Sequence, residues 1–563
     1  MTQQERRPLR RSGSLLGAAS RSLADGTFSG DSVRPAGREE IFPVALAAVV
    51  LAFIALMVCT ARGYLLLYGD AVAHLGIARR IMDSRNPGWP QLGGVWLPLP
   101  HLLMMPFVQK MEWWQSGLAG AWPSMLSYVL SVAGLYRLTR RLMTPKWALA
   151  ATAFYAVNPN LLYLSTTAMT EPLFLALLIW IALLTAECVD AIRASKPGVV
   201  ASRLIFGALL IVGAVFTRYD GWILGAAAWC VIAWELWRKR TMWRSVAPAF
   251  VFFTLLVVAA PVSWLAYNQH FFHDPLDFMR GPYSAAAIEK KTSPPGSRHY
   301  RGWHNPGWAL LFYTRTAQVD AAAWETGFAV MLAAVSGLVL AVRRKVALDM
   351  LLLWIPLPFY VYSIAYGSIP IFIPQLWPHS YYNARYGMEL LPALAVSMFF
   401  ALEWLQRRWN GTNPLGARLL HPVMLSLVAM NAMWMMYKTP LVLKEGVVNS
   451  ITRVAFERSI AHEIQSFTAG VPFLMYNSDH IGAIQDAGIP LQQTLNEGDW
   501  DSWHAALENP AKQAAYVIAI AGDPVSKAVA AHPENLTELT VLCTTGQPCA
   551  RIYKSDIYVA GAR

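Results

Sequence analysis

The chain has 563 residues, of which 55% are hydrophobic and only 14% are charged. Soluble chains usually carry about 25% charged residues, so this composition excludes a large soluble enzyme and indicates a protein that crosses a membrane several times. The net charge of +12 lies in short basic clusters between apolar runs. Such clusters orient membrane helices and do not form a nucleic-acid-binding surface.

Residues 1–40 are rich in Arg, Ser and Gly, and we expect them to form a disordered tail. Apolar runs of about 20 residues predict spanning helices, and the chain holds about eleven such runs. The pair Asn158-Pro159 is expected to bend or break the third one. The predicted spans are residues 42–61, 118–138, 147–165, 171–189, 204–216, 222–237, 246–267, 324–342, 346–366, 385–405 and 419–437.

The basic residues predict the orientation of these spans. The Arg-rich tail is expected to stay in the cytoplasm, because positive charge is retained there. Alternation through the spans then places every later basic cluster on the cytoplasmic side, at residues 137–146, 193–203, 238–244, 343–345 and 407–418. The same alternation places outside the membrane the stretch around Asp70, the turns at 171 and 218–220, the segments 268–323 and 367–384, and the C-terminus.

The sequence changes character after residue 440, where short apolar strands alternate with helical segments. We expect strands near 472–476, 516–520, 539–542 and 551–553, and helices near 461–467, 500–507 and 525–531. The pattern predicts a mainly α membrane bundle over residues 41–440, followed by a small extracytoplasmic α/β domain over residues 441–563. Cys543 and Cys549 lie close together in that domain, where an oxidising compartment would allow a local disulfide.

Asp70 and His74 stand four residues apart, directly after the first span. A helix over residues 70–84 would place both on one face. Asp70 is then either the N-cap of that helix or a general base at the membrane–water boundary. His74 is either a buried interfacial histidine or a group that orients Asp70 or joins a metal site, although two ligands do not make a site.

Two further polar turns face the same predicted side. Glu171 begins the fourth span, where a carboxylate also favours the helix dipole. The turn Arg218-Tyr219-Asp220 is either a self-satisfied ion pair or a phosphate-binding turn, because the guanidinium fork matches phosphate oxygens.

A third polar cluster opens the tenth span, where Tyr382, Arg385 and Tyr386 occur together. An arginine at a helix end can extend to the interface, and tyrosines form interfacial belts. The same combination also suits a phosphate-bearing lipid headgroup.

Two stretches between the spans are of a different kind. Residues 98–106 are apolar and rich in proline, but too short to span, so they form either a re-entrant segment or a packed loop. Residues 268–323 show no regular pattern, and we expect a mobile loop that covers substrate. His270, His273 and Asp274 within it match no zinc motif.

These features together resemble the membrane glycosyltransferases of the GT-C fold, over about residues 42–440. The resemblance rests on the Asp after the first span, the Pro-rich segment that follows, Thr-Glu-Pro at 170–172, Arg-Tyr-Asp-Gly at 218–221 and Ala-Arg-Tyr-Gly at 384–387. The nearest relatives would be the protein-mannosyltransferase, aminoarabinose-transferase and bacterial lipid-linked-sugar transferase group.

The resemblance implies inverting transfer of a sugar from a polyprenyl-phosphate donor to a lipid, glycan or protein acceptor, on the outer face of a bacterial inner membrane. It assigns Asp70 the role of general base, and Arg218 and Arg385 contact with the donor phosphate. Several family members have a paired Asp-Glu in the first loop, whereas Ala71 follows Asp70 here, which leaves the acceptor open. The chemistry requires no cofactor and is compatible with a divalent metal ion.

Two other classes of function fit a polytopic membrane protein. A transporter or lipid flippase would place ionisable residues along a path through the bilayer. Here the polar clusters gather on one side, and inverted repeats are not evident, which favours a one-sided enzyme. A non-catalytic envelope-assembly protein would use the C-terminal domain for docking. Loss of sugar transfer on Asp70→Asn distinguishes the enzyme from both.

Overall fold

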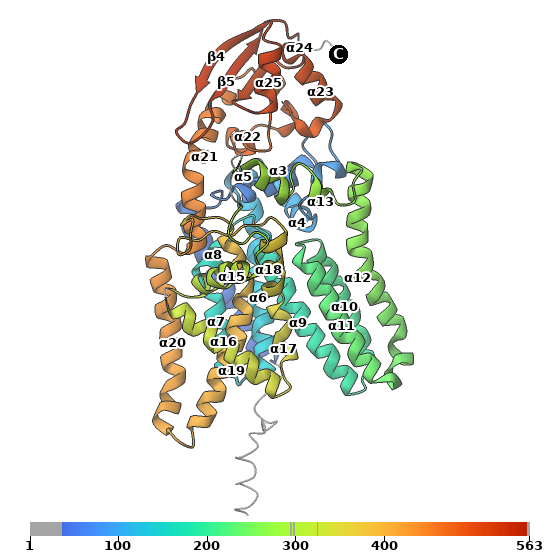
Figure 1. The fold of residues 1–563 in the computed structure, drawn as a ribbon, viewed down its shortest axis with the longest axis vertical. Coiled ribbons are helices and arrows are strands. Elements are labelled where there is room, and N and C mark those ends of the chain that lie inside the picture. The colour runs from blue at the N-terminus through green and yellow to red at the C-terminus, as the bar shows by residue number, and fades with distance from the viewer. Residues whose placement is uncertain (1–35, 293–295, 297–298, 324, 560–563) are drawn as a thin grey trace, which may run out of the picture.

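The computed structural model describes residues 36–292, 296, 299–323 and 325–559. It is a bundle of long helices with a small α/β unit stacked on one end (Figure 1). Most of the tail expected at residues 1–40 lies outside the described residues. The first described helix, α2, begins at Arg38.

The first half of the bundle contains long apolar helices and, after α2, a run of short ones. Its elements are α2 (Arg38–Ala61), α3 (Gly69–Arg80), η1 (Trp89–Leu92), α4 (Leu99–Val108), α5 (Met111–Ser116), α6 (Leu118–Arg140), α7 (Pro145–Ala156), α8 (Pro159–Leu164), α9 (Glu171–Arg193), α10 (Pro197–Val215) and α11 (Asp220–Arg238).

The second half begins with a long helix and ends in a helical hairpin. Its elements are η2 (Arg240–Met242), α12 (Trp243–Phe272), α13 (Asp277–Arg280), α14 (Ala285–Thr292), α15 (Pro306–Ala321), α16 (Thr326–Arg343), α17 (Leu348–Leu351), η3 (Leu352–Trp354), α18 (Pro356–Tyr366), η4 (Ala384–Leu390), α19 (Leu391–Trp409), α20 (Pro414–Tyr437) and α21 (Leu441–Gln465).

Nine helical segments of the described chain are long and apolar enough to cross a membrane. They correspond to nine of the predicted spans. The other two predicted spans take different forms. Residues 147–165 break at Asn158-Pro159 into α7 and α8, because Asn158 caps α8 and Pro159 opens it. Residues 222–237 form α11, which is 19 residues long but is not among the nine.

The outward surface of the bundle is apolar, as a lipid-facing surface requires. Phe42, Met57 and Leu332 expose 70–71% of their surface. Charged residues meet instead in ion pairs between neighbouring helix ends. Arg141 lies 2.7 Å from Asp190 and 2.5 Å from Asp349.

The segment 268–323 differs from the expected irregular loop. Its first residues extend α12 to Phe272, and it also contains α13, α14 and the 16-residue helix α15. The Asn305 side chain accepts a hydrogen bond from the Trp308 amide, and Pro306 opens the helix. Thr, Arg and Gln residues interrupt the apolar positions of α15, so its helical period was not recognised in the sequence.

The α/β unit follows α21, a 25-residue helix of which only the last turn was expected. Its elements are β1 (Phe473–Met475), α22 (Ile481–Ala487), η5 (Leu491–Gln493), β2 (Thr494–Leu495), η6 (Glu497–Asp499), α23 (Asp501–Glu508), α24 (Pro510–Gln513), β3 (Tyr516–Ile520), α25 (Pro524–Ala531), β4 (Leu536–Leu542) and β5 (Ala550–Ser555).

The strand order is β2-β1-β3-β5-β4. Strands β2, β1 and β3 run parallel, whereas β5 pairs antiparallel with β3 and β4. A disulfide joins Cys543 to Cys549 between β4 and β5. The strands match the expected positions, except that β2 was not predicted, because two residues carry no readable period.

The short helices α3, α4 and α5 form a layer between the bundle and the α/β unit (Figure 1). Specific contacts hold the layer to that unit. The Gln91 side chain donates a 3.0 Å hydrogen bond to the Gly498 carbonyl, and the Gln485 side chain donates to the Trp114 carbonyl. The layer therefore supports the α/β unit and places Asp70, which lies on α3, at the end of the bundle.

Candidate active site

A cavity of about 1260 Å³ opens at the end of the bundle nearest the α/β unit. All the site residues expected from the sequence line it. They are Asp70, His74, Glu171, Arg218, Tyr219, Asp220, Tyr382, Arg385 and Tyr386. They come from α3, α9, the turn into α11, the loop before η4 and the start of η4, so the fold brings together residues that are more than 300 positions apart in the sequence.

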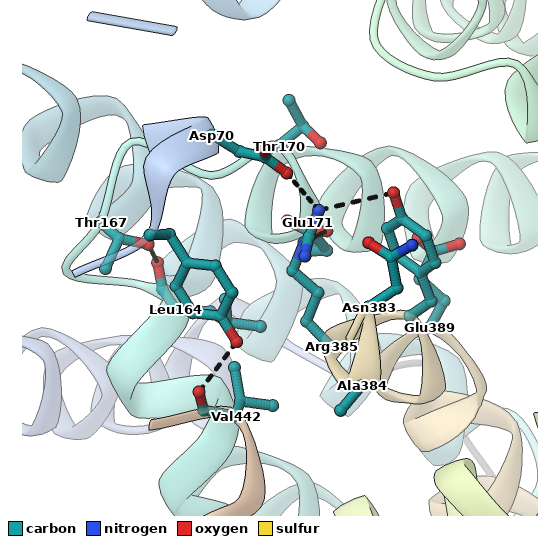
Figure 2. A network of polar contacts seen from close by, with 12 residues as sticks. Asp70, Leu164, Thr167, Thr170, Glu171, Asn383, Ala384, Arg385, Glu389 and Val442 are labelled. Carbon is teal, nitrogen blue, oxygen red and sulfur yellow. Dashed lines mark hydrogen bonds and ion pairs between the residues drawn. The ribbon is translucent and has the colours of Figure 1, made fainter. Parts of the chain in front are cut away.

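Asp70 lies in the first turn of α3, with Tyr68 at the N-cap position. The interpretation of Asp70 as the helix cap is wrong, because the residue lies two positions past the N-cap, inside the helix. Its side chain points away from the helix, and its Oδ2 atom accepts a hydrogen bond from Arg385 Nη2 (Figure 2). The side chain is 43% exposed in the cavity, and Oδ1 has no hydrogen-bond partner among the described residues.

Arg385 is buried at the start of η4 and is surrounded by acceptors. In addition to its bond to Asp70, Arg385 donates through Nε to Glu171 Oε1 at 3.1 Å. Its Nη1 atom lies 3.7 Å from Glu445. The guanidinium therefore joins three carboxylates from three helices, which is the kind of compensation that a buried charge requires.

Arg218 lies on the other side of Glu171. Its Nη1 atom donates to Thr170 at 2.7 Å and to Glu171 Oε1 at 3.3 Å. Its Nη2 atom donates to the Tyr360 hydroxyl at 2.6 Å, and Nε lies 3.0 Å from Glu389. One oxygen of Glu171 therefore bridges the two arginines.

The Tyr386 ring lies beneath both guanidiniums. Its centroid is 5.0 Å from the Arg218 Cζ atom and 4.8 Å from that of Arg385. Such cation–π contacts attract each cation to the ring face without neutralising it. Tyr386 thus separates two like charges and holds both at the wall of the cavity.

The site is rich in carboxylates. Around the two guanidiniums lie Asp70, Glu171, Asp220, Glu389 and Glu445. Full ionisation of these seven side chains would leave a formal charge of −3. Both arginines are already paired, so an incoming phosphate has to share them with carboxylates.

The sequence left open that His74 orients Asp70. In the structure, His74 does not do so. It turns instead to His101 on α4, and the two rings share a 2.8 Å hydrogen bond between Nδ1 and Nε2. Burial, followed by the nearby positive charges of Arg385 and Arg218, lowers the pKa of His74 to about 3. Burial also lowers the pKa of His101. Both imidazoles are therefore neutral at physiological pH.

The two remaining tyrosines shape the cavity wall. The Tyr219 hydroxyl donates to the Val95 carbonyl at 2.6 Å, and its ring stacks on Phe278 at 4.7 Å. Tyr382 forms an isolated β-bridge with Phe372. Further aromatic side chains also line the cavity, namely Trp222, Tyr300, Phe359, Tyr366 and Trp377.

Sequence reasoning missed Glu389, Glu445 and Tyr360. Glu389 had a signal, because a carboxylate within an apolar run of a spanning segment is costly and marks a buried partner. Glu445 had none, since Lys444-Glu445-Gly446 has the composition of a surface turn. The described residues contain no group of three or more His, Cys, Asp or Glu side chains arranged to hold a metal ion.

Comparison with known proteins agrees with this architecture. Residues 109–264 match the family model of dolichyl-phosphate-mannose-protein mannosyltransferases. No curated protein sequence matches the chain. The structure is similar to crystal structures of ArnT from Cupriavidus metallidurans. The form bound to undecaprenyl phosphate has a TM-score of 0.56 and 15% identity, and covers 92% of this chain and 98% of that one.

The apo form of the same ArnT has a TM-score of 0.53 and 16% identity, with 90% of this chain and 97% of that chain covered. Both matches extend over the bundle and the α/β unit, since each covers nearly the whole of both chains. The chain has the GT-C fold of membrane glycosyltransferases.

Proposed function

We propose that this protein transfers a sugar from a polyprenyl-phosphate donor to an acceptor hydroxyl, with inversion, on the extracytoplasmic face of a bacterial inner membrane. The observation that carries the proposal is the position of Asp70. Its carboxylate is partly exposed in a large cavity and is held there by a buried arginine. A general base requires this combination of a fixed position and a free oxygen.

In this mechanism Asp70 accepts the proton of the acceptor hydroxyl. The acceptor oxygen attacks the anomeric carbon of the donor sugar, and a new C–O bond forms there. The bond from that carbon to the phosphate oxygen breaks, and the electron pair leaves with the polyprenyl phosphate. Attack opposite the leaving group inverts the anomeric centre.

Arg218 and Arg385 stabilise the charge that develops on the leaving phosphate. Fixed cations placed where charge appears lower the barrier without reorganisation. Glu171 holds the two arginines together, so their positions exist before the donor binds. Most of the other residues that line the cavity are aromatic or apolar, which suits a polyprenyl chain. The mechanism needs no cofactor.

The basic clusters support the orientation, because they would remain in the cytoplasm and leave the cavity outside. The acceptor is a lipid, glycan or protein on that side, and Ala71 after Asp70 does not select among them. Residues 41–440 would carry the reaction, and the α/β unit would stand above the cavity.

The proposal is tested by purifying the protein with its lipids and identifying co-purifying polyprenyl phosphates by mass spectrometry. Sugar transfer is then measured for the unaltered protein and for Asp70→Asn. The matched control is Asp83→Asn, which alters an acid paired with Arg79 just beyond α3 and outside the cavity. Retained transfer in Asp70→Asn would show that Asp70 is not the base, whereas a lack of transfer by the unaltered protein would favour a transporter or an assembly protein.

A further inference from the structure

Glu445 on α21 is a buried carboxylate whose oxygens both face the start of η4. Its Oε1 accepts a 2.8 Å hydrogen bond from the Asn383 amide, and its Oε2 accepts one of the same length from the Ala384 amide. The next residue, Arg385, places Nη1 3.7 Å from Oε1. Only 2% of the Glu445 surface is exposed.

This geometry meets a specific need at the start of η4. The first N–H groups of a helix have no partner within the helix, and leaving one buried and unpaired is costly. Asn383 has a left-handed backbone with φ 55°, which turns the two amides toward α21. A carboxylate supplies an acceptor to each amide, whereas a carboxamide of the same shape supplies an acceptor to one and directs its own N–H groups at the other.

The beginning of α21 is itself fixed by other parts of the site. The Val442 amide donates to the Asn160 side chain at 2.9 Å. The Tyr68 hydroxyl donates to the Val442 carbonyl at 2.8 Å (Figure 2). Farther along the helix, Arg453 donates to the carbonyls of Leu66 and Leu67, just before α3. The helix α21 therefore makes hydrogen bonds both to the segment that bears Asp70 and to the segment that bears Arg385.

We propose that Glu445 is a positioning residue of the transfer site, acting through the start of η4 to place the Arg385 guanidinium against Asp70. This inference rests on the proposed function. The effect reaches Asp70 through Arg385, since Glu445 does not line the cavity. It also makes α21, which continues into the α/β unit, part of the active-site framework.

The same helix provides a matched control. Glu457 lies 12 residues farther along α21, is also buried, and accepts from Arg453 Nη1 at 2.5 Å. Its other neighbours, His480 and Gly482, belong to the α/β unit. A merely structural requirement for a buried acid on α21 applies to both residues, whereas a role in placing Arg385 applies only to Glu445.

The experiment compares Glu445→Gln, Glu445→Asp and Glu457→Gln in lipid nanodiscs. Hydrogen–deuterium exchange of the peptide over residues 379–390 reports on the start of η4 without requiring activity. We expect faster exchange in Glu445→Gln, partial recovery in Glu445→Asp, and unaltered exchange there in Glu457→Gln. Unaltered exchange in Glu445→Gln would overturn the inference.

Transfer kinetics give the second readout. We expect Glu445→Gln to lower kcat by about tenfold or more, because misplacing a catalytic group by a fraction of an ångström is costly, with the KM for donor changed less. An unaltered kcat in Glu445→Gln would overturn the role of Glu445 in transfer. Glu457→Gln is the control for the exchange measurement alone, because its partner Arg453 also holds the segment before α3. Faster exchange in a protein that transfers no sugar would refute the proposed function and leave the placement of η4 by Glu445 intact.

Discussion

Arg385 donates a hydrogen bond to the Asp70 carboxylate across 315 positions of the sequence (Figure 2). The contact fixes the position of the proposed base at the cavity wall.

Replacing Asp70 with Asn removes the proposed base and keeps the size of the side chain. We expect turnover to fall by about 10²–10⁴-fold, the usual contribution of a general base. Binding of undecaprenyl phosphate, measured by thermal shift in nanodiscs, should persist because the arginines remain. The Asp83→Asn control should retain transfer. A loss of both turnover and lipid binding would instead indicate a collapsed site.

Replacing Arg385 with Ala or Lys tests the phosphate contact. Lys carries the charge but lacks the planar fork that meets Asp70, Glu171 and Glu445 together. We expect weaker binding of undecaprenyl phosphate in both variants, with Ala the more severe. The control is Arg551→Ala, which breaks an exposed ion pair on the α/β sheet. Unchanged lipid affinity in Arg385→Ala would argue against phosphate contact.

The buried histidine pair predicts an acid sensitivity of stability. Burial lowers the pKa of His74 from 6.5 to about 3. Between these values the unfolded chain binds a proton that the folded protein excludes, so stability rises with pH up to about 6.5 and falls as the pH drops toward 3. When the pH is lowered from 6.5 to 4.5, we expect the apparent melting temperature of His74→Asn to fall by less than that of the unaltered protein.

The control for this comparison is His532→Asn, which alters an exposed histidine of the α/β unit. It should keep the pH dependence of the unaltered protein. Identical slopes in all three proteins would show that His74 is not the group responsible.

Gly387 in η4 faces α15 with no space for a side chain. A Cβ atom there would lie 2.5 Å from Asp320 Oδ2 and 2.7 Å from the Ala317 amide nitrogen. Gly387→Ala must therefore push η4 away from α15, and we expect a lower melting temperature together with lost transfer. Gly411→Ala is the control, because a Cβ at that position meets nothing within 4 Å. A fully active, equally stable Gly387→Ala protein would contradict the packing described.

Local signals in the sequence were enough to predict the bundle and to select side chains that line one cavity. Apolar run length and the Asn158-Pro159 break follow from short-range physics, and so does strand β3, which spans Tyr516–Ile520 as expected. The partners within the site did not follow from such signals. Asp70 resembled a helix cap because propensity describes only neighbours along the chain, whereas its actual partner comes from η4.

Glu445 shows the same limit more sharply. Both oxygens of Glu445 accept hydrogen bonds from backbone amides. Because these amides belong to the backbone, the residue types at positions 383 and 384 do not indicate the contacts. The segment 268–323 was assigned too little structure for a related reason. The helix α15 is stabilised by tertiary packing, including the stacking of Tyr313 on Tyr360 at 4.8 Å, more than by its own periodicity.

The position of Glu445 so late in the chain has a consequence for biosynthesis. Helices leave the ribosome in order, and the contacts that complete η4 become available only when α21 has emerged. Until then Arg385 would sit beside Asp70 and Glu171 with two backbone amides of its helix unpaired. A nascent chain that has already inserted its earlier apolar helices therefore still lacks the acceptor for these two amides.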